Sequence, residues 1–289
     1  MQKKIMIDTN SFLVILKCNL RCKLCCTFTG PAHIKNPPHF SIERLKECAK
    51  KYFETIDFVR KMPLTGGEPM LTPDLHELIE YINENFNEQF DILEVLTNGT
   101  LIPNENILNM IERYKEKMLI FIDHYGEISN KVDELVDILE KRSIKYTIRM
   151  YHGKDAKYGG WVDLGDFNYK HDENKAKNIY KSCFLVNTPK KSSGEYRPLD
   201  INHDNTLYIP YMCMVDGILA PCGRSHATLR KNIISDQSHD SVNLMDKNKT
   251  KEQLCNEINE LIFRPYLISC QYCNGFLSDS KRFLPAEQI

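Results

Sequence analysis

The sequence predicts an α/β fold built on a parallel sheet, and three observations support this. Short apolar segments alternate five times with segments whose apolar residues recur at helical spacing, as in β-α units joined by right-handed crossovers. The connections between these segments are short. Glycine-rich or polar residues follow the predicted strands at their carboxyl ends, where the sites of parallel α/β folds gather.

The predicted elements can be placed in order along the first half of the chain. Ser41 caps the first helix, which continues to Ile56, and Thr72 with Pro73 opens the second. Two further helices are predicted over residues 107–114 and 132–139. The five strands are predicted over residues 12–16, 58–64, 92–96, 118–122 and 144–150. A sixth strand is expected between Tyr151 and Leu185.

Three cysteines follow the first predicted strand: Cys18, Cys22 and Cys25, with three and then two residues between them. Three thiolates on one loop can hold three corners of a cubane iron–sulfur cluster, whose usual ligand set is four cysteines. The fourth iron is then open to a small ligand. A zinc knuckle or unrelated buried cysteines are the alternatives, but zinc sites usually come as paired two-thiol knuckles.

Beyond about Lys175 the alternation stops and cysteines return. The polar segment Thr188–Asn205 contains Pro, Gly and Ser and is predicted to be a surface insertion. Asp216 and Gly217 predict the turn of a β-hairpin. Outward pairing from this turn sets Cys213 opposite Ala220 and Tyr211 opposite Cys222. Cys270 and Cys273 follow a helix predicted over residues 254–262.

Composition narrows the classes of partner and compartment. The 289 residues include 38 Lys and Arg and 39 Asp and Glu, for a net charge of -1, which favours neither nucleic acid nor an acidic membrane surface as partner. The first residues lack the apolar centre of a signal peptide, so we expect a cytoplasmic protein without a membrane anchor. Eleven cysteines, an odd number in that compartment, favour metal or catalytic thiols over disulfides.

The cysteine loop resembles the radical S-adenosylmethionine (SAM) superfamily, which often has the same Cys-Asn-Leu-Arg-Cys beginning found at Cys18–Cys22. The resemblance extends to Gly66-Gly67-Glu68, which in that family holds the methionyl amino group of SAM. It implies a partial (β/α)6 TIM-type barrel, open on one side, and a 4Fe-4S cluster. Asp123 stands where many relatives carry a serine that touches SAM. Arg149, unusual in a buried strand, could face the SAM carboxylate.

The second half resembles the twitch domain, the shortened relative of the SPASM domain, a small α+β unit that binds an auxiliary 4Fe-4S cluster. Gly217 and Cys222 fit its signature, as do Cys270 and Cys273. The first ligand is Cys183 or Cys213, so four of the five cysteines Cys183, Cys213, Cys222, Cys270 and Cys273 are expected to bind this cluster. A zinc ribbon is the alternative. The resulting division is a radical SAM core over residues 1–178 and a twitch-like domain over 179–289.

The resemblance implies reductive cleavage of SAM to a 5′-deoxyadenosyl radical that removes hydrogen from an unactivated C–H bond, with a flavodoxin or ferredoxin type protein as reductant. The short segment before the first strand leaves no room for a peptide-recognition domain, which favours oxidation or epimerisation of a small polar, sugar-like substrate. In an epimerase, whichever of Cys183 and Cys213 is not a ligand is the candidate hydrogen donor. The alternatives are a radical SAM maturase of a ribosomally synthesised peptide and a non-catalytic iron–sulfur electron carrier. The Gly-Gly-Glu motif speaks against the carrier.

Overall fold

The computed structural model of the chain describes residues 4–154, 156–187, 206–235 and 239–289. Within these residues eight strands form one open sheet in the order β5-β4-β3-β2-β1-β6-β7-β8. Neighbouring strands from β5 to β6 are parallel, and β7 and β8 add antiparallel pairs. The strands are β1 (Lys4–Ile15), β2 (Phe58–Gly66), β3 (Phe90–Thr97), β4 (Met118–His124), β5 (Tyr146–Met150), β6 (Thr206–Val215), β7 (Ile218–Ala220) and β8 (Val242–Asn243).

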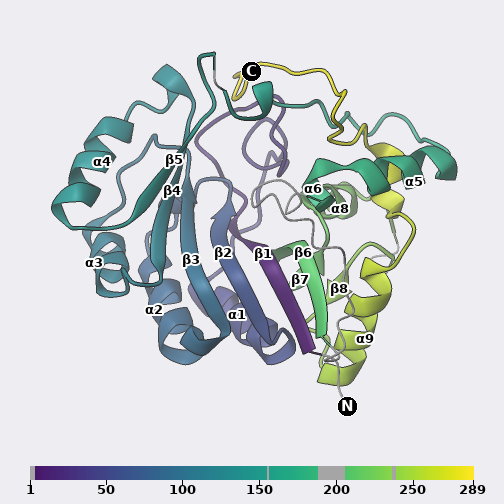
Figure 1. The fold of residues 1–289 in the computed structure, drawn as a ribbon, viewed down its shortest axis with the longest axis horizontal. Helices are drawn as coiled ribbons and strands as arrows, with labels where there is room; N and C mark the ends of the chain where they lie inside the picture. Colours follow the sequence, from purple (N-terminus) through teal and green to yellow (C-terminus); the bar gives the residue numbers. More distant parts are fainter. Residues whose placement is uncertain (1–3, 155, 188–205, 236–238) are drawn as a thin grey trace.

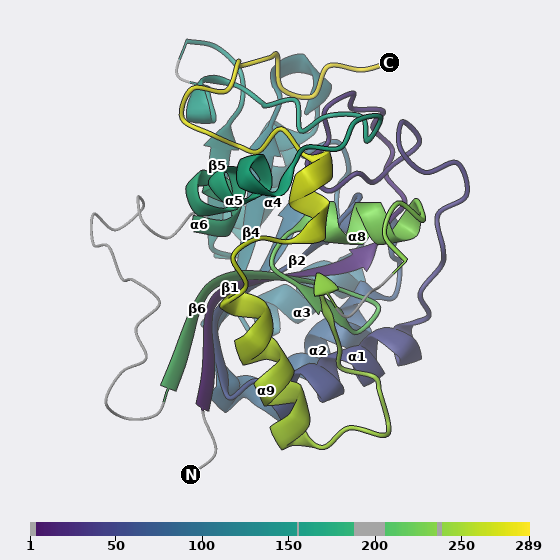
Figure 2. The same ribbon diagram turned by 90° about the vertical axis from the view of Figure 1, so that its right-hand side faces the viewer.

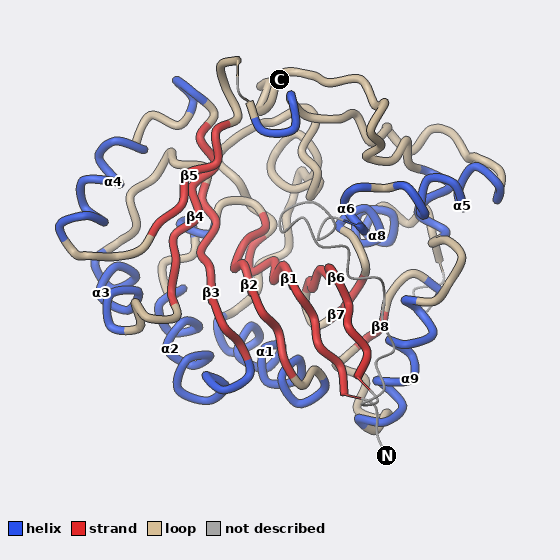
Figure 3. Tube along the Cα trace, viewed as in Figure 1, coloured by secondary structure: helices blue, strands red, loops and turns tan. Residues whose placement is uncertain are grey.

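Some of the helices cover one face of this sheet, and the others lie with loops toward the carboxyl ends of the strands (Figures 1 and 3). The helices are α1 (Ile42–Thr55), α2 (Leu75–Phe86), α3 (Glu105–Arg113), α4 (Val132–Lys141), α5 (Glu173–Ser182), α6 (Phe184–Asn187), α8 (Gly223–Arg230) and α9 (Lys251–Ile262). Helix α9 contacts α1 and continues the same helical layer beneath β1 and β6 (Figure 2). The loop after β1 and the chain from residue 276 onward lie above the carboxyl ends of the strands.

Local sequence explains where the covering helices begin and which face they bury. Ser41 Oγ accepts a hydrogen bond from Arg44 N at 3.2 Å and caps α1. At the start of α9, Thr250 and Gln253 form a reciprocal capping box. The apolar sides of both helices enter one hydrophobic core that also contains residues of β1 and β6. Burial of these faces against the same sheet joins the first and second halves of the chain.

The five predicted strands and the four helices between them are confirmed, and β1 begins eight residues earlier than predicted, at Lys4 instead of Phe12. The expected sixth strand between Tyr151 and Leu185 is wrong. In the described part of that segment, pairing is limited to an isolated bridge between Trp161 and Phe283. The sheet instead gains β6, which pairs in parallel with β1 on the side opposite β2.

The hairpin is confirmed, with Cys213 opposite Ala220. Strand β7 ends at Ala220, so Tyr211 has no partner at Cys222, which instead precedes the first turn of α8. The predicted insertion Thr188–Asn205 lies outside the described residues. Among the residues described, no helix is both long and apolar enough to cross a membrane.

Candidate metal and ligand sites

The three cysteines of the first motif lie on the loop that leaves the carboxyl end of β1. The sulfurs of Cys18 and Cys22 each accept from a nearby N–H group, as thiolate ligands of iron–sulfur clusters often do, and that of Cys25 contacts a hydroxyl. The contacts are Leu20 N to Cys18 Sγ at 3.4 Å, Gln288 Nε2 to Cys22 Sγ at 3.3 Å, and Thr27 Oγ1 to Cys25 Sγ at 3.1 Å. The donor set therefore fits three corners of a cubane cluster.

Burial sets the protonation of two of these thiols. It raises the pKa of Cys18 to about 12 and that of Cys22 to about 11. In the metal-free protein both therefore keep their protons at neutral pH. Because a metal binds the thiolate, cluster assembly must release these protons.

The glycine pair at the end of β2 packs against the start of the cysteine loop. Gly67 N donates to Ile15 O at 2.8 Å, and Glu68 N donates to Lys17 O at 3.0 Å. A Cβ on Gly66 would lie 2.0 Å from Ile15 O, and one on Gly67 would lie 1.9 Å from Lys17 O. Any side chain would push this backbone apart. Here the glycines allow the close approach of two backbone segments, and their contact with SAM remains a prediction.

Glu68 is fully buried at this junction. Its Oε1 accepts from Thr97 Oγ1 at 2.9 Å and from Met70 N at 3.1 Å, and its Oε2 accepts from Asn98 N at 2.8 Å. Within the described residues it forms no ion pair, and burial raises its pKa to about 7 despite these three donors. The carboxylate thus fixes the end of β3 and leaves its negative charge without a protein cation.

The turn after β3 connects Glu68 to the cysteine loop. Asn98 Nδ2 donates to Asn19 Oδ1 at 3.0 Å and lies 3.8 Å from Cys18 Sγ, while Asn19 Nδ2 donates to Thr100 Oγ1 at 2.7 Å. The side chains of Asn98 and Thr100 thus bind the loop that carries the three thiols.

Asp123 and Arg149, both expected at a SAM site, pair with each other. Arg149 Nε donates to Asp123 Oδ1 at 2.7 Å, and its second donor reaches Asp123 Oδ2 at 2.9 Å. The guanidinium also lies over the rings of Phe121 and Tyr151, 4.9 and 5.1 Å from their centroids. Trp161 packs edge-on against Tyr151. An ion pair between the buried Asp123 and the half-buried Arg149, framed by aromatic rings, therefore stands at the ends of β4 and β5.

A second group of thiols surrounds one small cavity. Its lining includes Cys183 at the end of α5, Cys222 before α8, and Cys270 and Cys273 near the 3-10 helix Ile268–Tyr272. Burial raises the pKa of Cys273 to about 12. Across the described ranges, no three His, Cys, Asp or Glu side chains are placed to hold a single metal ion. All eleven cysteines are described and none forms a disulfide.

Cys213 lies apart from that cavity lining. Its side chain packs with Leu13, Leu16 and Val215 in a small apolar cluster, and burial raises its pKa. Its carbonyl faces His226 Nε2 at 3.1 Å. The structure thus places Cys183, Cys222, Cys270 and Cys273 around the same cavity. Sequence spacing alone left open whether Cys183 or Cys213 joins the other three.

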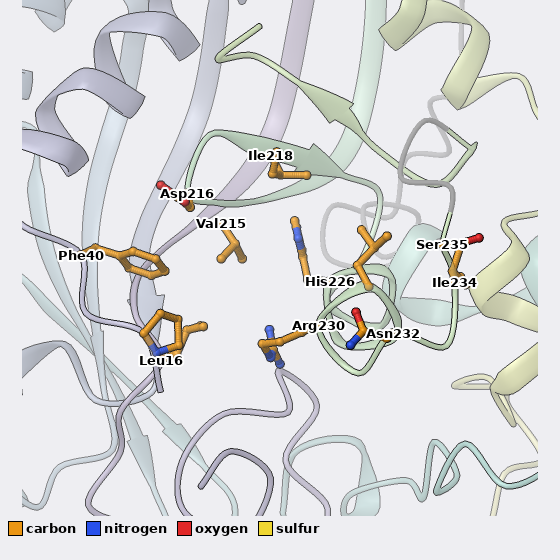
Figure 4. Close-up of a pocket in the computed structure, with 12 residues that line it drawn as sticks. Leu16, Phe40, Val215, Asp216, Ile218, His226, Arg230, Asn232, Ile234 and Ser235 are labelled. Carbon is orange, nitrogen blue, oxygen red and sulfur yellow. The ribbon is translucent and has the colours of Figure 1, made fainter. Parts of the chain in front are cut away.

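An open cavity of about 630 Å³ lies between the hairpin, α8 and the chain entering the cysteine loop. In Figure 4, His226 lies between the hairpin residue Ile218 above and Arg230 below, with Phe40 and Leu16 to the left. Burial lowers the pKa of His226 to about 4, so its imidazole is neutral at pH 7. Arg230 donates to Phe28 O at 2.9 Å.

Two further observations concern residues outside the predicted site. Asp163 and Asp166 accept from backbone N–H groups of Gly165 and Asn168, at 2.8 and 3.0 Å, which is the geometry of turn residues.

Gln288, which sequence reasoning missed, reaches Cys22. Gln288 is a single polar residue 266 positions from its partner, and no motif or spacing could have indicated the contact.

Comparison with known proteins finds a family match in the first half of the chain. Residues 12–154 match the model of the Radical SAM superfamily. Over 112 residues the chain is 31% identical to the antilisterial bacteriocin subtilosin biosynthesis protein AlbA of Bacillus subtilis (strain 168), covering 39% of this chain and 23% of AlbA. Over 86 residues it is 37% identical to the GTP 3′,8-cyclase of Syntrophomonas wolfei, covering 29% and 25% of the two chains. The chain therefore spans about a quarter of the length of these relatives.

Solved structures resemble the fold over nearly the whole chain. The structure of BtrN in complex with AdoMet and 2-DOIA has a TM-score of 0.53 at 15% identity and covers 100% of both chains. Native anSMEcpe with bound AdoMet also has a TM-score of 0.53, at 16% identity, and covers 97% of this chain and 94% of its own. At these identities the likeness concerns the fold alone.

Proposed function

Because residues 12–154 form a domain of the radical SAM superfamily, we propose that the protein is an enzyme that cleaves SAM reductively and oxidises or epimerises a small polar, sugar-like substrate. The observation that carries this proposal is the loop after β1, where Cys18 and Cys22 each have an N–H donor near the sulfur and Cys25 Sγ contacts the Thr27 hydroxyl. When bound, the cluster and SAM supply an electron and a 5′-deoxyadenosyl radical that removes hydrogen from a C–H bond.

The chain's own residues hold and orient these groups. Cys18, Cys22 and Cys25 bind three irons and leave the fourth open. The backbone at Gly66 and Gly67 and the negative charge of Glu68 attract the methionyl amino group. Glu68 acts from beneath the surface, because its oxygens are occupied by Met70 N, Thr97 and Asn98 N.

Asp123 and Arg149 are assigned to the same ligand. The Arg149 side chain is 27% exposed while that of Asp123 is 8% exposed, so the guanidinium keeps N–H groups beyond the two that bind Asp123 accessible to a ligand. A carboxylate of SAM or of the substrate is the group that such a donor recognises. Asp123 fixes the orientation of the guanidinium through two hydrogen bonds.

A second 4Fe-4S cluster is assigned to Cys183, Cys222, Cys270 and Cys273, in a twitch-like arrangement. The support is their common cavity. Cys213 is then the thiol left without a metal. It is the proposed hydrogen donor if the reaction is an epimerisation, since it lies beside Leu16 at the entry to the first cysteine loop.

The open cavity beside the cysteine loop supports a small substrate, because about 630 Å³ is within the range of small-molecule sites. His226 and Arg230 provide polar contacts there. The likeness to AlbA, whose name refers to bacteriocin biosynthesis, favours a second candidate, modification of a ribosomally made peptide. An electron carrier would have no use for the glycine pair and the buried Glu68. A flavodoxin or ferredoxin type protein is the proposed reductant.

The proposal is tested by anaerobic reconstitution followed by incubation with SAM and dithionite. The wild type should bind about eight irons and release 5′-deoxyadenosine. Cys25→Ala should bind about four and release none, while Cys26→Ala, which removes the adjacent exposed thiol, should match the wild type. Release of 5′-deoxyadenosine by Cys25→Ala at the wild-type rate would contradict the assignment of the first cluster.

A further inference from the structure

The segment Ala286–Ile289 lies along the cysteine loop as a short antiparallel partner. Lys23 N donates to Glu287 O at 2.8 Å, and Ile289 N donates to Arg21 O at 3.1 Å. The two segments are registered by an antiparallel bridge between Cys22 and Gln288. Residues 266 positions apart in sequence are thus fixed against each other at a predicted cluster ligand.

The carboxamide of Gln288 is oriented by its other contacts. Its Oε1 accepts from Arg21 N at 2.7 Å, and its Nε2 donates to Ala286 O at 2.6 Å. A flipped amide would set N–H against N–H and oxygen against oxygen, so this orientation is the one that satisfies both neighbours. The group 3.3 Å from Cys22 Sγ is therefore the N–H donor.

The segment is also anchored upstream. Trp161 N donates to Phe283 O at 2.9 Å, and Phe283 N donates to Trp161 O at 2.8 Å. Ala286, with φ of 55°, is completely buried. Side-chain pairing contributes little by comparison, because Lys23 and Glu287 are 3.5 Å apart and about half exposed. Backbone pairing and the burial of Ala286 thus hold Gln288, which is itself exposed, in place.

We propose that Gln288 is a positioning residue for the SAM cluster: it holds the loop at Arg21 and donates a hydrogen bond to the Cys22 thiolate. This inference rests on the proposed function, because it takes Cys22 as a cluster ligand. A hydrogen bond to a ligand sulfur stabilises the more negative, reduced state and raises the reduction potential of the cluster.

The test compares three variants of the full chain after anaerobic loading, with the potential of the first cluster followed by EPR-monitored redox titration. Gln288→Glu keeps an oxygen for Arg21 N and removes the donor, and Gln288→Met removes donor and acceptor without adding charge. Both should shift the potential to more negative values. Glu287→Gln, in which the exposed neighbouring side chain changes and the backbone pairing stays, should keep the wild-type potential.

A shift in Gln288→Glu without a shift in Gln288→Met would overturn the inference, because it would report the added charge alone. If Gln288→Met does not load iron, hydrogen exchange of residues 19–24 in the metal-free protein decides. Faster exchange at Arg21 N than in the wild type supports the contact, and unchanged exchange refutes it. A wild type that binds no iron would instead refute the proposed function, so the two failures are distinguishable.

Discussion

Glu68 allows a quantitative prediction about the balance between burial and hydrogen bonding. Three donors favour its carboxylate form, yet burial outweighs them and raises its pKa from 4.5 to about 7. Between these pH values the folded protein takes up a proton that the unfolded chain has released. The stability that protonated Glu68 contributes is therefore fully present below pH 4.5 and is lost as the pH rises through 7.

The size of the effect follows from the two pKa values. With 4.5 in the unfolded chain and about 7 in the folded protein, the contribution of Glu68 to the free energy of unfolding falls by about 2.5 kcal/mol between pH 5 and pH 8. The side chain in Glu68→Gln cannot titrate, so this variant lacks the pH dependence that Glu68 adds to the free energy of unfolding. Its amide hydrogens face backbone donors, which adds a cost independent of pH.

The assay is urea unfolding across pH 5 to 8, with SAM omitted, followed by the fluorescence of the single tryptophan, Trp161. The free energy of unfolding of the wild type relative to that of Glu68→Gln should decrease as the pH rises. Taking this difference removes the contributions of the other titrating groups, which the two proteins share. Glu88→Gln, at an exposed position, should show no such change. A relative stability independent of pH, or one that increases with pH, would refute the reasoning, because the three donors would then outweigh burial.

Three further predictions concern single side chains. Cys183→Ala should lose about four irons, whereas Cys213→Ala should keep about eight, because Cys183 lines the four-thiol cavity and Cys213 does not. Iron and zinc analysis measures this, and an equal loss of iron in both variants would contradict the assignment. Gly67→Ala should fail to load the first cluster, measured by EPR, because its Cβ would lie 1.9 Å from the backbone entering the cysteine loop. Asp123→Asn should lower the free energy of unfolding by about 2–4 kcal/mol in urea titrations, since Arg149 keeps its charge and loses its buried partner. A change below about 1 kcal/mol would show that Arg149 finds another acceptor.

The elements that the sequence predicts correctly depend on residues that lie close together in the chain. Helical spacing and caps such as Ser41 placed the covering helices, because both depend on residues within one turn. The Asp216-Gly217 turn fixed the hairpin register, with Cys213 opposite Ala220. The carboxyl-end placement of the cysteine loop followed from the parallel sheet.

Prediction failed where distant segments meet. Regular β-α alternation predicts a sixth strand between Tyr151 and Leu185, whereas the chain crosses to the other side of β1 and adds β6 there. The Gln288 contact and the cavity that Cys183 shares with three other thiols likewise depend on how separate segments pack. For Glu68, the sequence indicates the Gly-Gly-Glu motif but does not indicate that its side chain is fully buried.

The place of β1 in the sheet bears on how well the first cysteine loop is held. Strand β1 pairs with β2 on one side and with β6 on the other, so neither of its edges is free. The sheet and the hydrophobic core therefore continue across the boundary proposed at residue 178. Above the sheet, the same loop is bound by Asn98 from the first half and by Gln288 from the second. Contacts from both halves of the chain thus hold the loop at Cys18 and Cys22, which is the support that a site requiring a defined ligand geometry needs.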